Sequence, residues 1–358
     1  MPHTSPLDAA SLAPSHDAPQ HRPRPLPLFL DLLRNETAEN PDRMRAALKG
    51  LRAYQNAPRP PRPPAMPVVA EAGRARLRDY GGEGPPIVFV PSLINPPNVL
   101  DLTPEKSLLR WLATQGVRPL LVDWGDPGAE DRNMSVAGHV EQLLLPMLDA
   151  LGEPATLAGY CVGGTMALAA AARAPVRSLV LLATPWHFSG FPEGARSFLA
   201  DLWERAAPLA DHLGLLPIEV LQTSFWQLDR TRTIAKFEGF STVDPDSDTA
   251  RGFVALEDWA SDGPPLTYAA GRELIEDFFT ADLPGRSEWQ VGGAPVDPAA
   301  LSCPVLNIIS SKDRIVPAAS APQLGERKML DLGHVGMVVG SRARTSLWEP
   351  LAHWLLRS

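Results

Sequence analysis

The hydrophobic positions of the chain follow two different patterns, which meet close to residue 68. Residues 26–55 carry apolar side chains at helical spacing, and this spacing predicts one or two amphipathic helices. From residue 85 onward, short and almost uninterrupted apolar runs such as "IVFV" and "LVLL" take over. Runs of this kind, bounded by Pro and Gly, are typical of strands buried on both faces.

The apolar runs alternate with segments of helical spacing. Strands are expected within 85–92, 117–125, 154–159, 176–185 and 303–313, and another short run lies in 326–336. Helices are expected within 107–116, 139–152, 161–174 and 344–358. Because nearly all-apolar strands alternate with helices, the sequence predicts an α/β fold, a mostly parallel sheet with helices on both faces.

One long segment breaks the alternation. It holds five tryptophans and many helical stretches but no clear strand. We therefore predict four parts of the chain: a disordered tail, helical arm and stiff Pro-rich linker (1–67), a first core part (68–185), a helical cap or lid (186–303) and a second core part (304–358). The tail is expected to cover about the first 25 residues.

Composition narrows the function classes. The chain has 358 residues, 44% of them hydrophobic, enough for a large core with an insertion. A net charge of −8 without a dense basic tract argues against nucleic-acid binding. Two cysteines give no disulfide framework or zinc-ligand spacing, so no metal site is expected. Without a signal-like or membrane-spanning apolar run, a soluble cytoplasmic protein with reduced thiols is predicted.

The segment "ATLAGYCVGGTMALAA" (155–170) predicts a strand, a tight glycine turn and a helix, with Cys161 at the turn. This arrangement matches the nucleophile elbow of the α/β-hydrolase fold. The helix N-terminus favours a thiolate, and the backbone N–H of Val162 would point at an oxyanion. A second oxyanion donor is expected from Ser92 or Leu93. The alternative is that Cys161 is a small buried residue without chemistry.

In this fold an acid and then a histidine follow the nucleophile, each just after a strand. Asp313 follows the strand expected within 303–313, and His334 follows the next short run, so both meet the requirement. His334 would accept the thiol proton, and Asp313 would orient and stabilise the imidazolium. Asp123 and Asp331 are rival acids. Of the other histidines, three lie in the tail (His3, His16, His21), two on predicted helices (His139, His353) and two in the cap, where a pocket role stays open (His187, His212).

With these residues in place, the sequence resembles the polyhydroxyalkanoate synthases, α/β-hydrolase relatives that polymerise 3-hydroxyacyl-CoA. The resemblance is carried by "GYCVGG" at the elbow, "DRIVP" (313–317), "GHVGMVV" (333–339) and the stretch from "VPSLINPPNV" to "DWGDP" (90–127). The length of the chain and the residues of these motifs are most similar to those of the short synthases that work with a second subunit. The residue after the acid, usually His in the family, is Arg314 here.

The resemblance implies thioester catalysis: Cys161 accepts the hydroxyacyl group from CoA, and His334 with Asp313 deprotonates the next 3-hydroxyl. It implies no cofactor besides the CoA thioester substrate. The expected partners are hydroxyacyl-CoA, the growing polyester, and a second synthase subunit or granule proteins. A homodimer in the cytoplasm, on polyester granules, is also expected. The substrate pocket is expected to include Asn95, Tyr160, Trp186, Trp259 and Arg314.

Two other functions stay open. The same three residues would serve an esterase, a thioesterase or an intracellular polyester depolymerase, because water can attack an acyl-enzyme in place of a hydroxyacyl group. A catalytically inactive granule-associated protein is the third interpretation, supported by the Trp-rich cap and the amphipathic arm. The presence of Cys161, Asp313 and His334 together argues against this third function.

Overall fold

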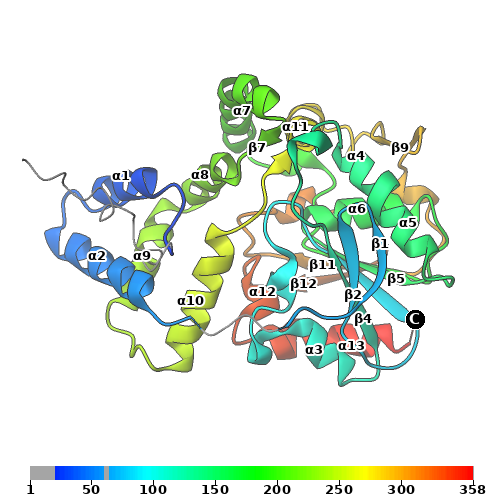
Figure 1. The fold of residues 1–358 in the computed structure, drawn as a ribbon, viewed down its shortest axis with the longest axis horizontal. Coiled ribbons are helices and arrows are strands. Elements are labelled where there is room, and N and C mark those ends of the chain that lie inside the picture. The colour runs from blue at the N-terminus through cyan, green and yellow to red at the C-terminus, as the bar shows by residue number, and fades with distance from the viewer. Residues whose placement is uncertain (1–20, 60–63, 358) are drawn as a thin grey trace, which may run out of the picture.

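The computed structural model describes residues 21–59 and 64–357 (Figure 1). Its centre is an eight-stranded sheet in the order β1-β2-β4-β3-β5-β6-β11-β12. The strands are β1 (Val68–Ala72), β2 (Ala75–Asp79), β3 (Pro86–Val90), β4 (Arg118–Asp123), β5 (Thr156–Tyr160), β6 (Leu179–Leu182), β11 (Val305–Ser310) and β12 (Glu326–Leu330). From β4 to β12 all neighbours pair in parallel, whereas β2 is antiparallel to both β1 and β4. The predicted α/β fold with a mostly parallel sheet is confirmed.

The first two strands were not among the predicted elements. In β2, the alternation of buried and charged residues reflects an antiparallel strand close to the sheet edge, with one face open to solvent. Five of the other six strands lie inside a predicted apolar run, and β5 extends one residue beyond its run. Buried parallel strands are therefore easy to predict here, and the polar edge hairpin is not.

Helices cover both faces of the sheet. In the view of Figure 1, α4, α5 and α6 lie on one side and α3 and α13 on the other. The bounds are α3 (Leu108–Ala113), α4 (Val136–His139), α5 (Leu145–Asp149), α6 (Val162–Ala171), α12 (Gly336–Val339) and α13 (Glu349–Leu355), with π-helical turns η5 (Val140–Leu144) and η10 (Arg344–Trp348). Short 3-10 turns are η2 (Pro97–Leu100), η3 (Pro104–Lys106), η4 (Ala129–Asp131), η6 (Phe188–Gly190), η8 (Pro298–Ala300) and η9 (Ala318–Ser320).

The segment predicted as a cap is mostly helical. It contains α7 (Glu193–Leu213), α8 (Ile218–Leu228), α9 (Arg230–Phe240), α10 (Asp248–Ser261), α11 (Tyr268–Arg272) and the π-helix η7 (Glu273–Thr280). Against the expectation of no strand, it also holds four two-residue strands: β7 (Leu215–Leu216), β8 (Leu266–Thr267), β9 (Gln290–Val291) and β10 (Ala294–Pro295). These strands are too short to give a sequence pattern.

Residues 21–59, here called the N-terminal arm, carry α1 (Leu26–Glu36) and α2 (Pro41–Asn56). Both helices pack on α9 of the cap, on the side away from the sheet (Figure 1). They share a hydrophobic cluster with the cap that is separate from the main core, and we call it the arm–cap cluster: Phe29, Leu32, Leu33, Ala47, Leu51, Tyr54, Ile234, Phe237, Phe240, Ala250 and Val254. Residues 1–20 of the predicted tail and the centre of the Pro-rich linker (60–63) lie outside the described residues. Residues 21–25, also predicted to belong to the disordered tail, are described and form the start of the arm.

No helix in the described part of the chain has the length and apolar character needed to cross a membrane.

Candidate active site

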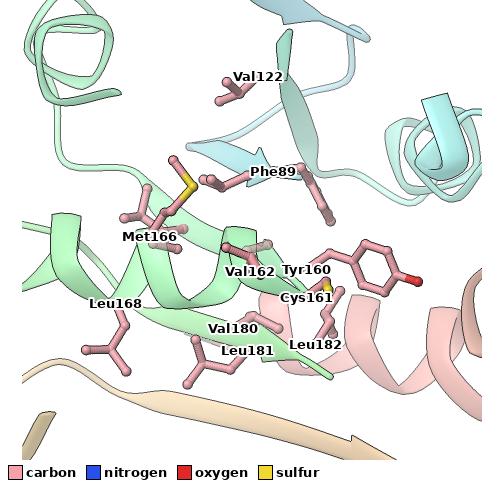
Figure 2. Packing of buried hydrophobic residues seen from close by; sticks show 14 of the residues in the cluster. Phe89, Val122, Tyr160, Cys161, Val162, Met166, Leu168, Val180, Leu181 and Leu182 are labelled. Carbon is pink, nitrogen blue, oxygen red and sulfur yellow. The ribbon is translucent and has the colours of Figure 1, made fainter. Parts of the chain in front are cut away.

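Cys161 occupies a strained turn between β5 and α6. Its backbone lies at φ 57° and ψ −133°, in a region that side chains other than glycine rarely adopt. Figure 2 shows Cys161 beside Tyr160 near the start of the helix, among buried residues of the core. The Cys161 N–H donates to the carbonyl of Leu182 at 3.0 Å, which ties the turn to the neighbouring strand. This is the geometry expected of a nucleophile elbow.

Glycines around Cys161 are required by close backbone contacts. A Cβ at Gly159 would collide with the backbone of Gly164, on the first turn of α6. A Cβ at Gly163 would collide with the backbone of Val90 and Pro91, at the end of β3. The sequence G-x-C-x-G-G therefore follows from the tight packing of strand, turn and helix.

Asp313 and His334 meet beside this turn. The Nδ1 atom of His334 lies 2.6 Å from Oδ2 of Asp313. The other carboxylate oxygen of Asp313 accepts the N–H groups of Ile315 and Val316, both at 2.8 Å. The Asp313 carboxylate is fully buried. A buried carboxylate with these donors is held in one orientation, which fixes the imidazole in turn.

The rival acids have other partners. Asp123 pairs with Arg78 at 2.8 Å on the antiparallel side of the sheet. Asp331 is exposed and pairs with Lys312 at 3.0 Å. Of the three acids considered, Asp313 is the one whose carboxylate bonds to His334.

The pKa of His334 is raised from 6.5 to about 10. Burial alone opposes the charged imidazolium, but the charge of Asp313, an ionised Cys161 and hydrogen bonds to both side chains outweigh it. Tyr160 also holds His334 in place, because its ring stacks on the imidazole with ring centroids 4.9 Å apart. The Tyr160 hydroxyl also donates to the backbone carbonyl of His334 at 3.2 Å. The site therefore favours a protonated histidine next to the thiol.

The predicted oxyanion donors belong to the start of α6 and to the loop after β3. Val162 is the first residue of α6, where N–H groups have no partner inside the helix. Ser92 and Leu93 lie in the loop after Pro91, close to the end of β3, which pairs with β5 up to Val90 and Gly159. The Ser92 hydroxyl accepts the N–H of Ile94 at 3.2 Å, so the loop folds back on itself beside Cys161. The arrangement suits an oxyanion hole built from Val162 and this loop.

A cavity of about 200 Å³ lies over Cys161 and His334. Three parts of the chain form its wall. The core contributes residues such as Ser92, Asn95 and Tyr160, the cap contributes Trp226, Phe237 and Trp259 among others, and the arm contributes Pro23 and Phe29. The cavity is thus a partly open space between the sheet, the cap and the arm, lined mainly by apolar and aromatic side chains as substrate pockets usually are.

Asn95, Tyr160 and Trp259 line the cavity, but Trp186 and Arg314 do not, contrary to the prediction. Trp186 is buried and packs edge-on against Trp289, with ring centroids 6.2 Å apart. Arg314 points outward and forms an ion pair with Asp229 of the cap. Trp186 follows β6 and Arg314 directly follows Asp313, yet neither side chain lines the cavity.

Most of the cavity-lining residues of the cap, and both of those from the arm, were not predicted from the sequence. The additional lining residues include Gln222, Phe225, Trp226, Lys236, Phe237, Glu257, Pro23 and Phe29. Lys236 and Glu257 form an ion pair of 2.7 Å, and the carboxylate is almost fully buried. Helical spacing identified these helices as amphipathic, but it does not distinguish a face that lines a pocket from one that fills a core.

The remaining histidines lie elsewhere. His139 is buried and edge-on to Trp124, and burial lowers its pKa to about 4, so it belongs to the core rather than to a solvated helix face. His187 and His212 do not line the cavity. His3 and His16 fall outside the described residues. Within residues 21–59 and 64–357, no group of three or more His, Cys, Asp or Glu side chains could hold a metal ion.

Residues 85–334 match the protein family described as alpha/beta hydrolase fold. This chain belongs to that family, as the elbow and the sheet order predict.

Curated relatives of this chain carry a more specific name. A poly(3-hydroxyalkanoate) polymerase subunit PhaC from Haloferax mediterranei is 27% identical over 80% of this chain, which spans 63% of that relative's length. The subunits of the same name from Synechocystis sp. and Allochromatium vinosum are each 28% identical over 75% of this chain, covering 77% and 80% of their lengths. The resemblance to the polyhydroxyalkanoate synthases is thereby confirmed.

Proposed function

We propose that this chain is an acyltransferase that polymerises (R)-3-hydroxyacyl-CoA into polyhydroxyalkanoate, with Cys161 as its nucleophile. One observation carries the proposal: a thiol on a strained elbow faces a cavity together with a histidine that is bonded to a buried aspartate. The names of the relatives supply the substrate class. A thiol nucleophile suits transfer between thioesters, since the leaving group and the attacking group are chemically alike.

Before the first step, the proton of the Cys161 thiol has passed to His334, which gives a thiolate–imidazolium pair, and the thiolate then attacks the thioester carbonyl. A bond forms between the Cys161 sulfur and the acyl carbon, the bond from that carbon to the CoA sulfur breaks, and CoA leaves with the proton from His334. The N–H groups of Val162 and of Ser92 or Leu93 stabilise the oxyanion of the intermediate. Asp313 stabilises the imidazolium that exists between these events.

In the second step, the 3-hydroxyl group of another hydroxyacyl unit attacks the acyl carbon on Cys161. His334 removes the hydroxyl proton and returns it to the departing sulfur of Cys161. An oxygen ester forms and the thiol is restored, so no cofactor besides the CoA thioester substrate takes part. Hydrolysis would follow the same course with water as the attacking group, so the outcome depends on how far the bound substrate and the cap exclude water from the acyl-enzyme.

The relatives are named as subunits, which supports a further proposal that this chain works with a second subunit. Homodimer formation, a cytoplasmic location and attachment to polyester granules stay predictions.

The test is the intact mass of the protein after mixing with (R)-3-hydroxybutyryl-CoA. We expect the wild type to gain one or more hydroxybutyryl units and Cys161→Ala to gain none. Cys303→Ala is the matched control, because it removes the only other cysteine of the sequence and should acylate like the wild type. Adducts of several units support polymerisation, whereas a single unit that decays to free hydroxybutyrate supports a hydrolase. An adduct retained by Cys161→Ala contradicts the assignment of the nucleophile.

A further inference from the structure

The N-terminal arm contributes directly to the wall of the cavity. Phe29 of α1 is 1% exposed to solvent, because it packs inside the arm–cap cluster. Its ring packs edge-on against Trp226 at 5.5 Å and Phe237 at 5.2 Å, measured between ring centroids. All three residues line the cavity, so one continuous aromatic wall combines the arm with the cap.

Polar contacts hold the arm in this position. Arg43 donates to both carboxylate oxygens of Glu238 at 2.8–3.2 Å. Tyr54 donates to Asp258 at 2.7 Å, at the other end of α2. Gly50 approaches the backbone carbonyl of Phe237 so closely that a Cβ would collide with it. The arm is therefore packed at backbone distance against the cap helix that lines the cavity, and Phe29 occupies a defined position.

We propose that Phe29 is a specificity-determining residue, which bounds the pocket for the alkyl side chain of the 3-hydroxyacyl group and limits the length of that side chain. The inference rests on the proposed function. The side chains of Cys161 and His334 line the cavity from the sheet. Phe29 lines it from α1, which lies beside α9 and away from the sheet in Figure 1. The wall around Phe29 is aromatic, which suits an alkyl group.

The polar side chains of the cap leave this wall free for an apolar ligand. Lys236 and Glu257 neutralise each other across 2.7 Å. Gln222 donates to the backbone carbonyl of Ala260. A change at Phe29 should leave the catalytic groups in place, because α1 packs on α9 and α2 and carries none of the catalytic residues. A shorter side chain there enlarges the cavity without moving Cys161 or His334.

The test compares acylation of Cys161 by (R)-3-hydroxybutyryl-CoA and (R)-3-hydroxyoctanoyl-CoA under single-turnover conditions. The variants are Phe29→Leu and the matched control Leu33→Ala. Leu33 lies one helical turn further along α1, is equally buried in the arm–cap cluster, and does not line the cavity. We expect Phe29→Leu to raise the octanoyl-to-butyryl rate ratio by about tenfold or more. Leu33→Ala should keep the wild-type ratio within about twofold.

Two outcomes overturn the inference. An unchanged ratio in Phe29→Leu means that the ring does not bound the alkyl pocket. An equal shift in both variants means that loosening of the arm, and not the ring itself, controls the ratio. If Phe29→Leu fails to fold, Phe29→Met is judged by the same criterion. A wild type that forms no adduct with either thioester instead overturns the proposed function, and the inference falls with it.

Discussion

The sheet and the arm–cap cluster contribute to the same cavity by different means. Cys161, Asp313 and His334 follow the carboxyl ends of β5, β11 and β12, parallel strands whose residues belong to one continuous core. The opposite wall rests on a smaller hydrophobic cluster between the arm and two cap helices. At its edges this cluster is tied by ion pairs such as Arg43 with Glu238.

The sheet thus holds the catalytic residues, whereas the arm–cap cluster shapes the pocket that selects the substrate. A large buried core opens only by global unfolding, whereas a small cluster with polar ties opens at a lower free energy. The distances between the catalytic atoms are thus protected by the most stable part of the molecule. The shape of the pocket depends on the less stable part, which can change without loss of the reaction. Four predictions test this division, in order of decreasing effect.

The largest effect is expected from Asp313→Asn. Asparagine keeps the shape but cannot stabilise the His334 imidazolium, so acylation of Cys161 should slow by about a thousandfold to ten-thousandfold. Asp331→Asn is the matched control, since its exposed carboxylate pairs with Lys312, and it should stay within about twofold of the wild type. The measurement is release of CoA in a single turnover. Comparable losses in both variants would contradict the role given to Asp313.

The second prediction concerns pH. Because the folded pKa of His334 is about 10 and its ordinary value is 6.5, protonated His334 stabilises the fold below pH 6.5, and this contribution disappears as pH rises toward 10. The free energy of unfolding of the wild type relative to His334→Gln should therefore fall between pH 6.5 and 10, by up to a few kcal/mol. Denaturant titrations of both proteins at several pH values measure it. A constant difference across this range would refute the raised pKa.

The third prediction compares two glycines. Gly163→Ala forces a Cβ against the backbone at the end of β3, so we expect a loss of about 3 kcal/mol of global stability together with loss of acylation. Gly50→Ala meets the Phe237 carbonyl in the arm–cap cluster, and the arm should undock while the sheet stays folded.

Limited proteolysis distinguishes these outcomes, because an undocked arm is cleaved before the rest of the chain. Gly239→Ala is the control: its Cβ meets nothing within 4 Å on α9, so the change should be neutral or slightly stabilising. If Gly50→Ala lowers the global stability as much as Gly163→Ala, the two regions form one cooperative unit.

The smallest effect is expected from the tie between the arm and the cap. Arg43→Gln removes a half-buried ion pair with Glu238 and should cost about 1 kcal/mol or less. Arg45→Gln serves as control, since Arg45 and its partner Asp42 are both exposed and should contribute almost nothing. Denaturant midpoints measure both variants. A larger loss in Arg45→Gln would show that the tie to Glu238 does not hold the arm.

Much of the catalytic half of the molecule can be predicted from the sequence. Strands buried on both faces leave uninterrupted apolar runs, and the elbow needs glycines around Cys161, because the backbones of strand, turn and helix nearly touch. The order of Asp313 and His334 follows from the order of the strands. Each of these features lies within a short stretch of sequence, next to one strand, so it can be recognised without knowledge of the fold.

The pocket half cannot be predicted in the same way. Phe29 and Phe237 meet across two helices that are far apart in the sequence, and their spacing within each helix only indicates an amphipathic face. Trp186 illustrates the same problem, since a large aromatic residue just after a strand fills the core here and not the pocket. Burial alone does not reveal which buried residues face an empty space.

The contact between Arg43 and Glu238 spans 195 residues of sequence, and this has a consequence during protein synthesis. A ribosome that adds about 5–20 residues per second needs roughly 10–40 seconds to make the partner after the arm. During that interval the apolar stripe of α1 and α2 has no partner from its own chain. The arm is the first described part of the protein to be made, and its partner α9 follows only after the turn that carries Cys161. A newly made chain therefore exposes the apolar stripe of α1 and α2 until α9 is available.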